Sequence, residues 1–304
     1  MKRLFLTIII LSLAIFTLCA DDLNVCVAWR KEVDNPLFET LLEANVYPTF
    51  LDQIKVETIS NEKTQNGGLT PFDAEKLKEI SFSDTNINAV IGEEKVDLII
   101  IPGGRDISPS LYNEEENGSK NESKDEDISD YILIKYALEN NIPLLGICRG
   151  MQMIAVYYGA SLIQDLPSFF TEKNIEYDNL HLSVNKTKEE PYSKHSIYIT
   201  NKDSILYSLF NEPIVEGLPS VHHQAIKTLE NTPLEVTAYT ETDGLLIIEA
   251  FEDVTNPRVL GIQFHPEKII PLEFDGADTS KYMAKEKAIS FFTSIFTSSV
   301  ACTK

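Results

Sequence analysis

The stretch PLLGICRGMQ, residues Pro143–Gln152, decides the fold of this chain. An apolar run enters a short turn, and an apolar pattern at helical spacing leaves it. The turn contains Cys148 between two glycines, Gly146 and Gly150. Small residues on both sides let a strand and a helix pack closely around a strained turn whose apex side chain projects outward. We interpret the stretch as a buried strand, a nucleophile elbow and a helix.

The sulfur of Cys148 is expected to face the first turn of that helix, where unpaired backbone N–H groups favour a thiolate. The alternative is that Cys148 is a small buried hydrophobe, as many unpaired cysteines are. The strand–turn–helix setting favours the first interpretation. We predict that Cys148 is a nucleophile.

Continuous apolar runs at residues 23–29, 96–102 and 259–264 alternate with helical patterns at residues 37–45 and 131–140. This alternation predicts an α/β fold with a mostly parallel sheet covered on both faces. Ligands of such sheets bind at the carboxyl ends of the strands. The Gly103-Gly104 turn and Cys148 both follow predicted strands. We therefore expect them to lie at one edge of the sheet.

The apolar run at residues 259–264 ends in His265-Pro266-Glu267. A cysteine nucleophile needs a base that holds the thiolate and later protonates the leaving amine, and imidazole suits both tasks. Glu267 is close enough to orient the ring of His265. The backbone N–H groups of Arg149 and Gly104 are candidate donors for the oxyanion of a tetrahedral intermediate. The sequence thus predicts a Cys148–His265–Glu267 triad.

His222 and His223 are adjacent, which makes a metal pair one interpretation. Adjacent histidines seldom bind one ion in extended chain, and no cysteine or carboxylate cluster was evident beside them. We therefore expected no metal. A phosphate loop and a dinucleotide fingerprint are both absent from the sequence, so no cofactor was expected either.

The chain opens with Lys2 and Arg3, an apolar run over residues 4–19, and Ala20. This is typical of a signal peptide over residues 1–20, leaving a hydrolase domain over 21–304. We expect a secreted, lysosomal or vacuolar protein without stable membrane insertion after cleavage. An uncleaved signal anchor is the alternative, and lipidation at Cys19 is a weaker one.

The formal charge is −21 for 304 residues and becomes −23 once Lys2 and Arg3 are removed. Such acidity excludes a nucleic-acid partner that needs a basic footprint. Residues 113–130 are acidic and rich in Asn and Ser, which predicts a solvated loop. Three N-glycosylation motifs begin at Asn117, Asn121 and Asn185. Cys26 is expected in the core, and a Cys26–Cys302 bridge is an alternative for an oxidising compartment.

Six motifs together resemble the class I glutamine amidotransferase-like gamma-glutamyl hydrolases. The branch of the gamma-glutamyl-gamma-aminobutyrate hydrolases is the most similar, with the folate gamma-glutamyl hydrolases as exported cousins. The motifs are IPGGRDISPSLY (101–112), GICRGMQ (146–152), SLIQDL (161–166), HHQAIK (222–227), DGLLIIEA (243–250) and GIQFHPEK (261–268). The chain departs from that branch at Glu126-Asp127, Pro219 and Gly159-Ala160. These departures bear on the leaving half of the substrate.

The resemblance implies a flavodoxin-like, doubly wound fold and hydrolysis of a small gamma-glutamyl substrate through a glutamyl thioester. It assigns catalysis to Cys148, His265 and Glu267, and the oxyanion hole to Gly104 and Arg149. It also implies that Gln152 and His222 bind substrate. A homodimer is compatible with the sequence. The alternatives are a glutaminase subunit that serves a synthetase and a catalytically inactive binding protein of the same fold.

Overall fold

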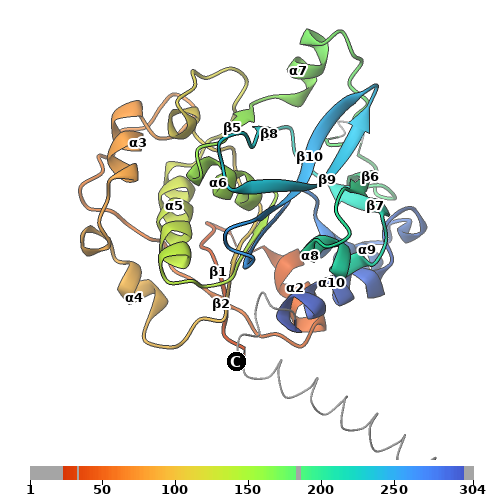
Figure 1. Cartoon of the computed structure of the whole chain (residues 1–304), viewed down its shortest axis with the longest axis horizontal. Coiled ribbons are helices and arrows are strands. Elements are labelled where there is room, and N and C mark those ends of the chain that lie inside the picture. The colour runs from red at the N-terminus through yellow and green to blue at the C-terminus, as the bar shows by residue number, and fades with distance from the viewer. Residues whose placement is uncertain (1–22, 33, 183–185, 298–304) are drawn as a thin grey trace, which may run out of the picture.

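The computed structural model describes residues 23–32, 34–182 and 186–297 (Figure 1). The predicted signal peptide, Cys19, Asn185 and Cys302 lie outside these ranges. A nine-stranded sheet forms the centre, in the order β2-β1-β3-β4-β11-β10-β9-β6-β7. A two-stranded sheet, β5-β8, lies beside it. No helix within the described ranges is both long and apolar enough to cross a membrane.

One half of the large sheet is parallel. It consists of β2 (Thr49–Phe50), β1 (Val25–Val27), β3 (Leu98–Ile101), β4 (Leu144–Ile147) and β11 (Val259–Ile262). Their spatial order is the 2-1-3-4-5 order of flavodoxin-like folds when β11 is counted as the fifth parallel strand. This confirms the predicted doubly wound α/β fold.

The other half of the sheet is antiparallel and comes from the chain between β4 and β11. It contains β6 (Ser193–Ile199), β7 (Ile214–Ser220), β9 (Leu234–Thr242) and β10 (Leu245–Asp253). The small sheet pairs β5 (Ser161–Ile163) with β8 (Ala225–Thr228). Asp243 and Gly244 join β9 to β10 and both have positive φ, as a two-residue hairpin turn requires.

Helices cover both faces of the sheet. On one face lie α3 (Pro71–Lys78), α4 (Ile87–Ile91), α5 (Lys124–Glu139) and α6 (Arg149–Tyr157). On the other lie α2 (Asn35–Glu43), α8 (Ile205–Phe210), α9 (Ile269–Asp275) and α10 (Lys285–Thr297). The helix α7 (Leu166–Glu172) packs against the small sheet. Short 3₁₀ turns occupy Phe82–Asp84, Pro109–Tyr112, Pro266–Lys268 and Thr279–Lys281.

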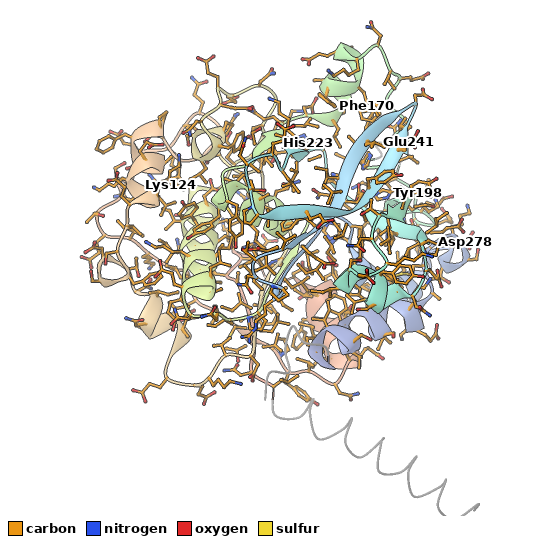
Figure 2. All side chains as sticks on the ribbon, in the orientation of Figure 1. Lys124, Phe170, Tyr198, His223, Glu241 and Asp278 are labelled. Atoms are coloured by element: carbon orange, nitrogen blue, oxygen red, sulfur yellow. The ribbon has the colours of Figure 1, made fainter. Side chains whose placement is uncertain are left out.

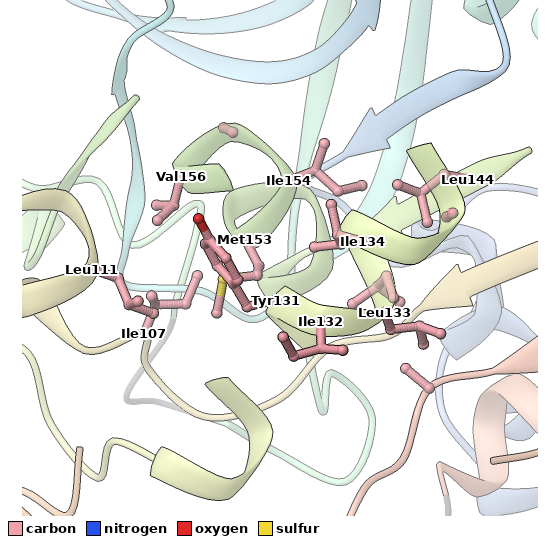
Figure 3. Close-up of a cluster of buried hydrophobic side chains, with 14 of the residues drawn as sticks. Ile107, Leu111, Tyr131, Ile132, Leu133, Ile134, Leu144, Met153, Ile154 and Val156 are labelled. Carbon is pink, nitrogen blue, oxygen red and sulfur yellow. The ribbon is translucent and has the colours of Figure 1, made fainter. Parts of the chain in front are cut away.

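Alternating side chains of each parallel strand supply the two cores. Ile99 and Ile101 point into the core under α5 and α6, whereas Leu98 and Ile100 point into the core under α2 and α10. Successive residues of a strand face opposite sides of the sheet, so a strand buried on both faces must be apolar throughout. Figure 3 shows the first core, where Ile134 of α5 meets Ile154 of α6.

The predicted solvated loop at residues 113–130 is wrong over its second half. The helix α5 begins at Lys124 rather than at Tyr131, and the side chain of Ser123 caps it by accepting a hydrogen bond from Glu126 N–H. Lys124 is 3% exposed and pairs with the buried Asp73 of α3 at 2.7 Å. Figure 2 labels Lys124 beside α3. Paired charges can be buried, so an acidic run need not be solvated.

Candidate active site

Cys148 is held in a strained conformation at the end of β4. Its backbone has φ 53° and ψ −107°, a region that residues with a side chain seldom occupy. Its N–H donates a 2.7 Å hydrogen bond to the carbonyl of Ile262, so β11 fixes the turn. The helix α6 begins at the next residue, Arg149. This is the strand–elbow–helix geometry that the sequence predicts.

The two glycines of the elbow are required by close packing. A Cβ placed on Gly150 would lie 1.9 Å from the carbonyl oxygen of Ile101 on β3. A Cβ on Gly146 would lie 2.6 Å from the backbone nitrogen of Met151. Both distances are shorter than the distances that Cβ atoms keep from backbone atoms in real proteins. The helix can therefore lie against the sheet only because these positions have no side chain.

His265 follows β11, the strand that is paired with β4. Its N–H donates a 2.9 Å hydrogen bond to the carbonyl of Pro219, and its Nδ1 lies 2.5 Å from Oε1 of Glu267. Its Nε2 is buried and has no hydrogen-bond partner among the described residues. A Cβ on Gly103 would meet both the His265 ring, at 3.2 Å, and Cβ of Cys148, at 3.9 Å. The side chains of Cys148 and His265 therefore both lie next to Gly103, and so close to each other.

Charge keeps the His265 ring protonated. Burial lowers its pKa, but Glu267 and then the Cys148 thiolate outweigh burial and raise the pKa to about 10. Burial raises the pKa of Glu267, and the adjacent imidazolium more than reverses this and holds the pKa below its usual range. The imidazolium is therefore the favoured form of His265 at neutral pH, which gives a nucleophile at Cys148 a proton donor for the leaving group.

Gly104 and Arg149 lie on either side of the elbow. Arg149 is the first residue of α6, so its N–H has no partner within the helix. The Gly104 N–H donates to no acceptor among the described residues. A Cβ on Gly104 would lie 2.7 Å from Cδ of Arg149, which places the two residues side by side. Their amides are thus available to a ligand at Cys148.

A buried ion network fixes this turn, and the sequence did not predict it. Asp130 of α5 accepts two hydrogen bonds from Arg30, at 2.9 and 3.0 Å, and also pairs with Arg149. Asp127 binds the same Arg149 at 2.6 Å. Arg30 in turn donates to the carbonyls of Pro102 and Gly103, at 2.6 and 2.7 Å. The guanidinium groups therefore tie α5, the elbow and the Gly103-Gly104 turn together.

The cavity at Cys148 has a volume of about 360 Å³, and both basic and acidic side chains line it. Its lining includes Arg30, Lys31, Glu32, Asp34, Gly103, Gly104, Arg105, Glu126, Cys148, Val221, His265 and Lys268. A larger cavity, of about 770 Å³, lies between α2, α9 and Tyr192, and contains neither a nucleophile nor a histidine. The smaller cavity is therefore the candidate active site.

Gln152 and His222 do not line this cavity, in contrast to the substrate contacts expected for them. The amide of Gln152 donates to the carbonyl of Gln224 and to the side chain of Gln263, both at 2.9 Å. The ring of His222 is turned into the protein, and the side chain is 2% exposed. Val221, its neighbour, faces the cavity instead. Both predicted side chains are engaged within the fold.

The two adjacent histidines have separate environments. His223 contacts Asp106 at 2.9 Å and Asp165 at 3.1 Å, near the small sheet (Figure 2). His222 joins a buried cluster with His181, His195 and Glu249. The premise that no cysteine or carboxylate cluster joins the histidine pair does not hold, because each histidine has carboxylate neighbours in the fold. Glu249 is distant in sequence, and only the pairing of the strands brings it close.

The chain is 32% identical over 242 residues to the glutamine amidotransferase-like protein RP404 of Rickettsia prowazekii, covering 69% of this chain and 82% of the relative. It is 28% identical over 240 residues to gamma-glutamyl-gamma-aminobutyrate hydrolase PuuD of Escherichia coli K12, covering 77% and 87%.

The solved structure of PurLQS from Thermotoga maritima shares the fold, with a TM-score of 0.51 at 15% identity over 90% of this chain and 98% of that one. The model of the peptidase C26 family matches residues 80–267, which include the elbow, the Gly103-Gly104 turn and the His265-Pro266-Glu267 segment. On this match and these relatives, the chain belongs to the peptidase C26 family.

Proposed function

We propose that this protein is a cysteine hydrolase that cleaves gamma-glutamyl amide bonds. The observation that supports it most is the strained elbow that presents Cys148 beside the His265–Glu267 pair. The similarity to a gamma-glutamyl-gamma-aminobutyrate hydrolase supports the substrate class. The reaction needs no group beyond those of the chain and water.

In the proposed reaction, the Cys148 thiolate attacks the gamma-carbonyl carbon, and a C–S bond forms as the carbonyl becomes an oxyanion. The N–H groups of Gly104 and Arg149 hold that oxyanion. The His265 imidazolium then gives its proton to the amine nitrogen, and the C–N bond breaks to leave a glutamyl thioester. Water, deprotonated by His265, attacks the thioester and releases glutamate and the thiolate.

The charges of the cavity suit the alpha-amino acid end of a glutamyl group. Burial lowers the pKa of Lys268, but Glu267 and then Asp34 outweigh it and raise the pKa, so this ammonium stays charged. It is a partner for the alpha-carboxylate, and Glu32 or Asp34 is one for the alpha-ammonium. A cavity of about 360 Å³ is at the small end for ligand sites and favours a compact amine as leaving group.

The test is a panel of substrates with the purified protein: gamma-glutamyl-aminobutyrate, a gamma-glutamyl dipeptide, a folate polyglutamate and glutamine. We expect glutamate release from a gamma-glutamyl amide and none from the Cys148→Ala variant. Ammonia release from glutamine alone, rising when a synthetase partner is added, would favour the glutaminase subunit. If neither the wild type nor Cys148→Ala releases glutamate or ammonia from any substrate of the panel, the inactive binding protein would be favoured.

We also propose export through residues 1–20 and cleavage after Ala20, as the charged start and apolar run suggest. Amino-terminal sequencing of the protein from its own host would test this. Asp21 as the first residue would support cleavage, and Met1 would favour the signal anchor. Size-exclusion chromatography with light scattering would decide between a monomer and the homodimer that we propose as compatible with the sequence.

A further inference from the structure

A second cluster of chemically active side chains lies outside the lining of the Cys148 cavity, in the antiparallel half of the sheet at the right of Figure 1. One atom from each of His181, His195, His222 and Glu249 lies within 4.8 Å of the others. The side chains of His181, His195 and Glu249 are 0% exposed, and that of His222 is 2% exposed.

The distances between these atoms fit ligands around one small cation. Oε1 of Glu249 lies 3.4 Å from Nδ1 of His181, 3.5 Å from Nε2 of His195 and 3.8 Å from Nε2 of His222. Nδ1 of His181 lies 3.2 Å from Nε2 of His222. Four ligands placed 2.0–2.1 Å from a tetrahedral Zn²⁺ would be separated by about 3.3 Å. These four of the six separations are thus near the spacing that such an ion imposes, and all six lie within 4.8 Å.

Several of these atoms have no other partner. Both carboxylate oxygens of Glu249 and both ring nitrogens of His195 are buried without a hydrogen bond in the described structure. An unpaired buried carboxylate is costly, and such groups in proteins are normally paired or bind metals. A cation between the four side chains would satisfy Oε1 of Glu249 and Nε2 of His195 together.

The orientation of His222 is also that of a metal ligand. Its Nδ1 donates a 2.9 Å hydrogen bond to the carbonyl of Gln224, which leaves the lone pair of Nε2 directed at the cluster. The carbonyl of His181 accepts hydrogen bonds from His222 N–H at 3.0 Å and from the Ser220 hydroxyl at 2.9 Å. The backbone thus positions two of the four side chains before any ion binds.

Irregular strand pairing brings the other two together. The register of β6 with β7 shifts between His195 and Ile197, and the register of β10 with β9 shifts between Ile248 and Ala250, on either side of Glu249. Bulges of this kind redirect side chains. β6 pairs with β9 only at Tyr198 and Ile199, so the sheet opens at the His195 end. The four side chains meet in that opening.

We propose that His181, His195, His222 and Glu249 form a closed, tetrahedral Zn²⁺ site with a structural role. Three imidazoles and one carboxylate are a donor set that Zn²⁺ accepts, and four protein ligands leave no open position for water or substrate. The ion joins the segment around His181 to β6, to the end of β7 and to β10. Val221 and His265 flank this site, so it supports one wall of the Cys148 cavity.

The alternative is a metal-free cluster in which Glu249 carries a proton and the rings bond to one another. Glu249→Gln separates the two cases, because an amide resembles a protonated carboxyl in shape but is a poor zinc ligand. His223→Gln is the matched control, since His223 adjoins His222 in sequence and bonds outside the cluster. Cys148→Ala removes the reactive thiol as a source of adventitious metal.

The experiment measures metal in tag-free, full-length protein, expressed with Zn²⁺ in the medium and passed over a chelating resin. By mass spectrometry of the elements we expect about one Zn²⁺ per chain in the wild type, in His223→Gln and in Cys148→Ala, and about a tenfold loss in Glu249→Gln. Zinc equal in Glu249→Gln and wild type would overturn the proposal, as would a zinc-free wild type.

Two further measurements on the wild type keep the test decisive if Glu249→Gln folds poorly. Zn²⁺ added to chelator-treated wild type should raise the melting temperature, whereas no shift would contradict binding at this site. Co²⁺ in place of Zn²⁺ should give the strong visible absorption of tetrahedral cobalt. A weak, six-coordinate spectrum would overturn the closed geometry. None of these readouts depends on hydrolase activity, so the proposed function can fail independently.

Discussion

Nδ1 of His265 lies 2.5 Å from Oε1 of Glu267, although only Pro266 separates the two residues in the chain. Pro266 begins a short 3₁₀ turn at the end of β11, and that turn folds the glutamate back onto the ring. The hydroxyl of Thr40 on α2 donates a 3.0 Å hydrogen bond to the Glu267 carbonyl and holds the turn from the other side. The imidazole of His265 and the carboxylate beside it thus form one local unit.

Replacing Glu267 with Gln should narrow the pH range of activity. The raised pKa of His265 keeps the ring protonated as the pH rises above its ordinary range, until the proton is lost near pH 10. Removing the Glu267 charge lowers that pKa, so the alkaline fall of kcat/KM should move to lower pH. We also expect kcat to fall about a hundredfold or more, because the ring loses its orientation.

The measurement is kcat/KM as a function of pH for the wild type and Glu267→Gln. Glu32→Gln serves as the control for the position of the alkaline limb, since Glu32 lines the same cavity but the raised pKa of His265 comes from Glu267 and Cys148. An equal displacement of the alkaline limb in Glu32→Gln would contradict a specific role for Glu267.

The two described cysteines should differ in reactivity toward an alkylating reagent. Burial, followed by the charge of Glu94, raises the pKa of Cys26 to about 11, so its thiol stays protonated at neutral pH. Cys148 lies beside the His265 imidazolium and at the start of α6, where a thiolate is favoured. Peptide mapping after brief treatment with iodoacetamide should find the label on Cys148. Preferential labelling of Cys26 would be inconsistent with this account.

Asp130→Asn should disturb both stability and catalysis. Asp130 bridges Arg30 and Arg149, so its loss leaves two buried guanidinium groups short of a counter-charge. Removal of one partner from a buried ion pair costs about 3–5 kcal/mol. Because Arg30 also holds the Gly103 carbonyl, kcat should fall more than KM changes.

Denaturant unfolding and steady-state kinetics test this expectation. Asp125→Asn is the matched control, because Asp125 lies in the first turn of the same helix and its side chain is 46% exposed. That control should change the free energy of unfolding by no more than about 0.5 kcal/mol. Equal effects of the two substitutions would argue against the network.

Gly150→Ala should destabilise the fold at the elbow. The new methyl group would meet the Ile101 carbonyl at 1.9 Å, and neither backbone can move without separating α6 from β3. We expect a loss of about 3 kcal/mol in the free energy of unfolding. Gly159→Ala, with φ 96° and open space around its Cβ, should cost only about 1–2 kcal/mol through backbone strain. A mild effect at Gly150 would contradict the close packing.

Local sequence carries much of this fold and part of the site. Apolar runs bounded by glycine identify β3, β4 and β11, and the parallel pairing of those strands places the residues after them at one edge. The shared edge of these parallel strands is enough to predict that Gly104, Cys148 and His265 lie close together, and no other tertiary contact has to be known. The placement depends on strand ends, which short sequence patterns mark well.

The remainder depends on contacts that sequence patterns do not encode. Asp127 and Asp130 lie in an acidic run that suggests solvent, and their burial depends on Arg149, about 20 residues away. His195 and Glu249 meet through two irregular strand pairings, and His181 joins them through hydrogen bonds that its carbonyl accepts from Ser220 and His222. Gln152 and His222 occupy predicted positions along the chain, but their side chains bond within the fold. The burial of these charges and the orientation of these side chains can be seen only in the tertiary structure.

We propose that Cys148 carries a glutamyl group during turnover. Wild-type protein mixed with a gamma-glutamyl amide and quenched in acid should show, by mass spectrometry, one glutamyl thioester on the peptide that contains Cys148. The adduct should disappear as substrate is exhausted, and the Cys148→Ala variant should show neither adduct nor glutamate release. Glutamate release that persists in Cys148→Ala, with no adduct in the wild type, would contradict the account.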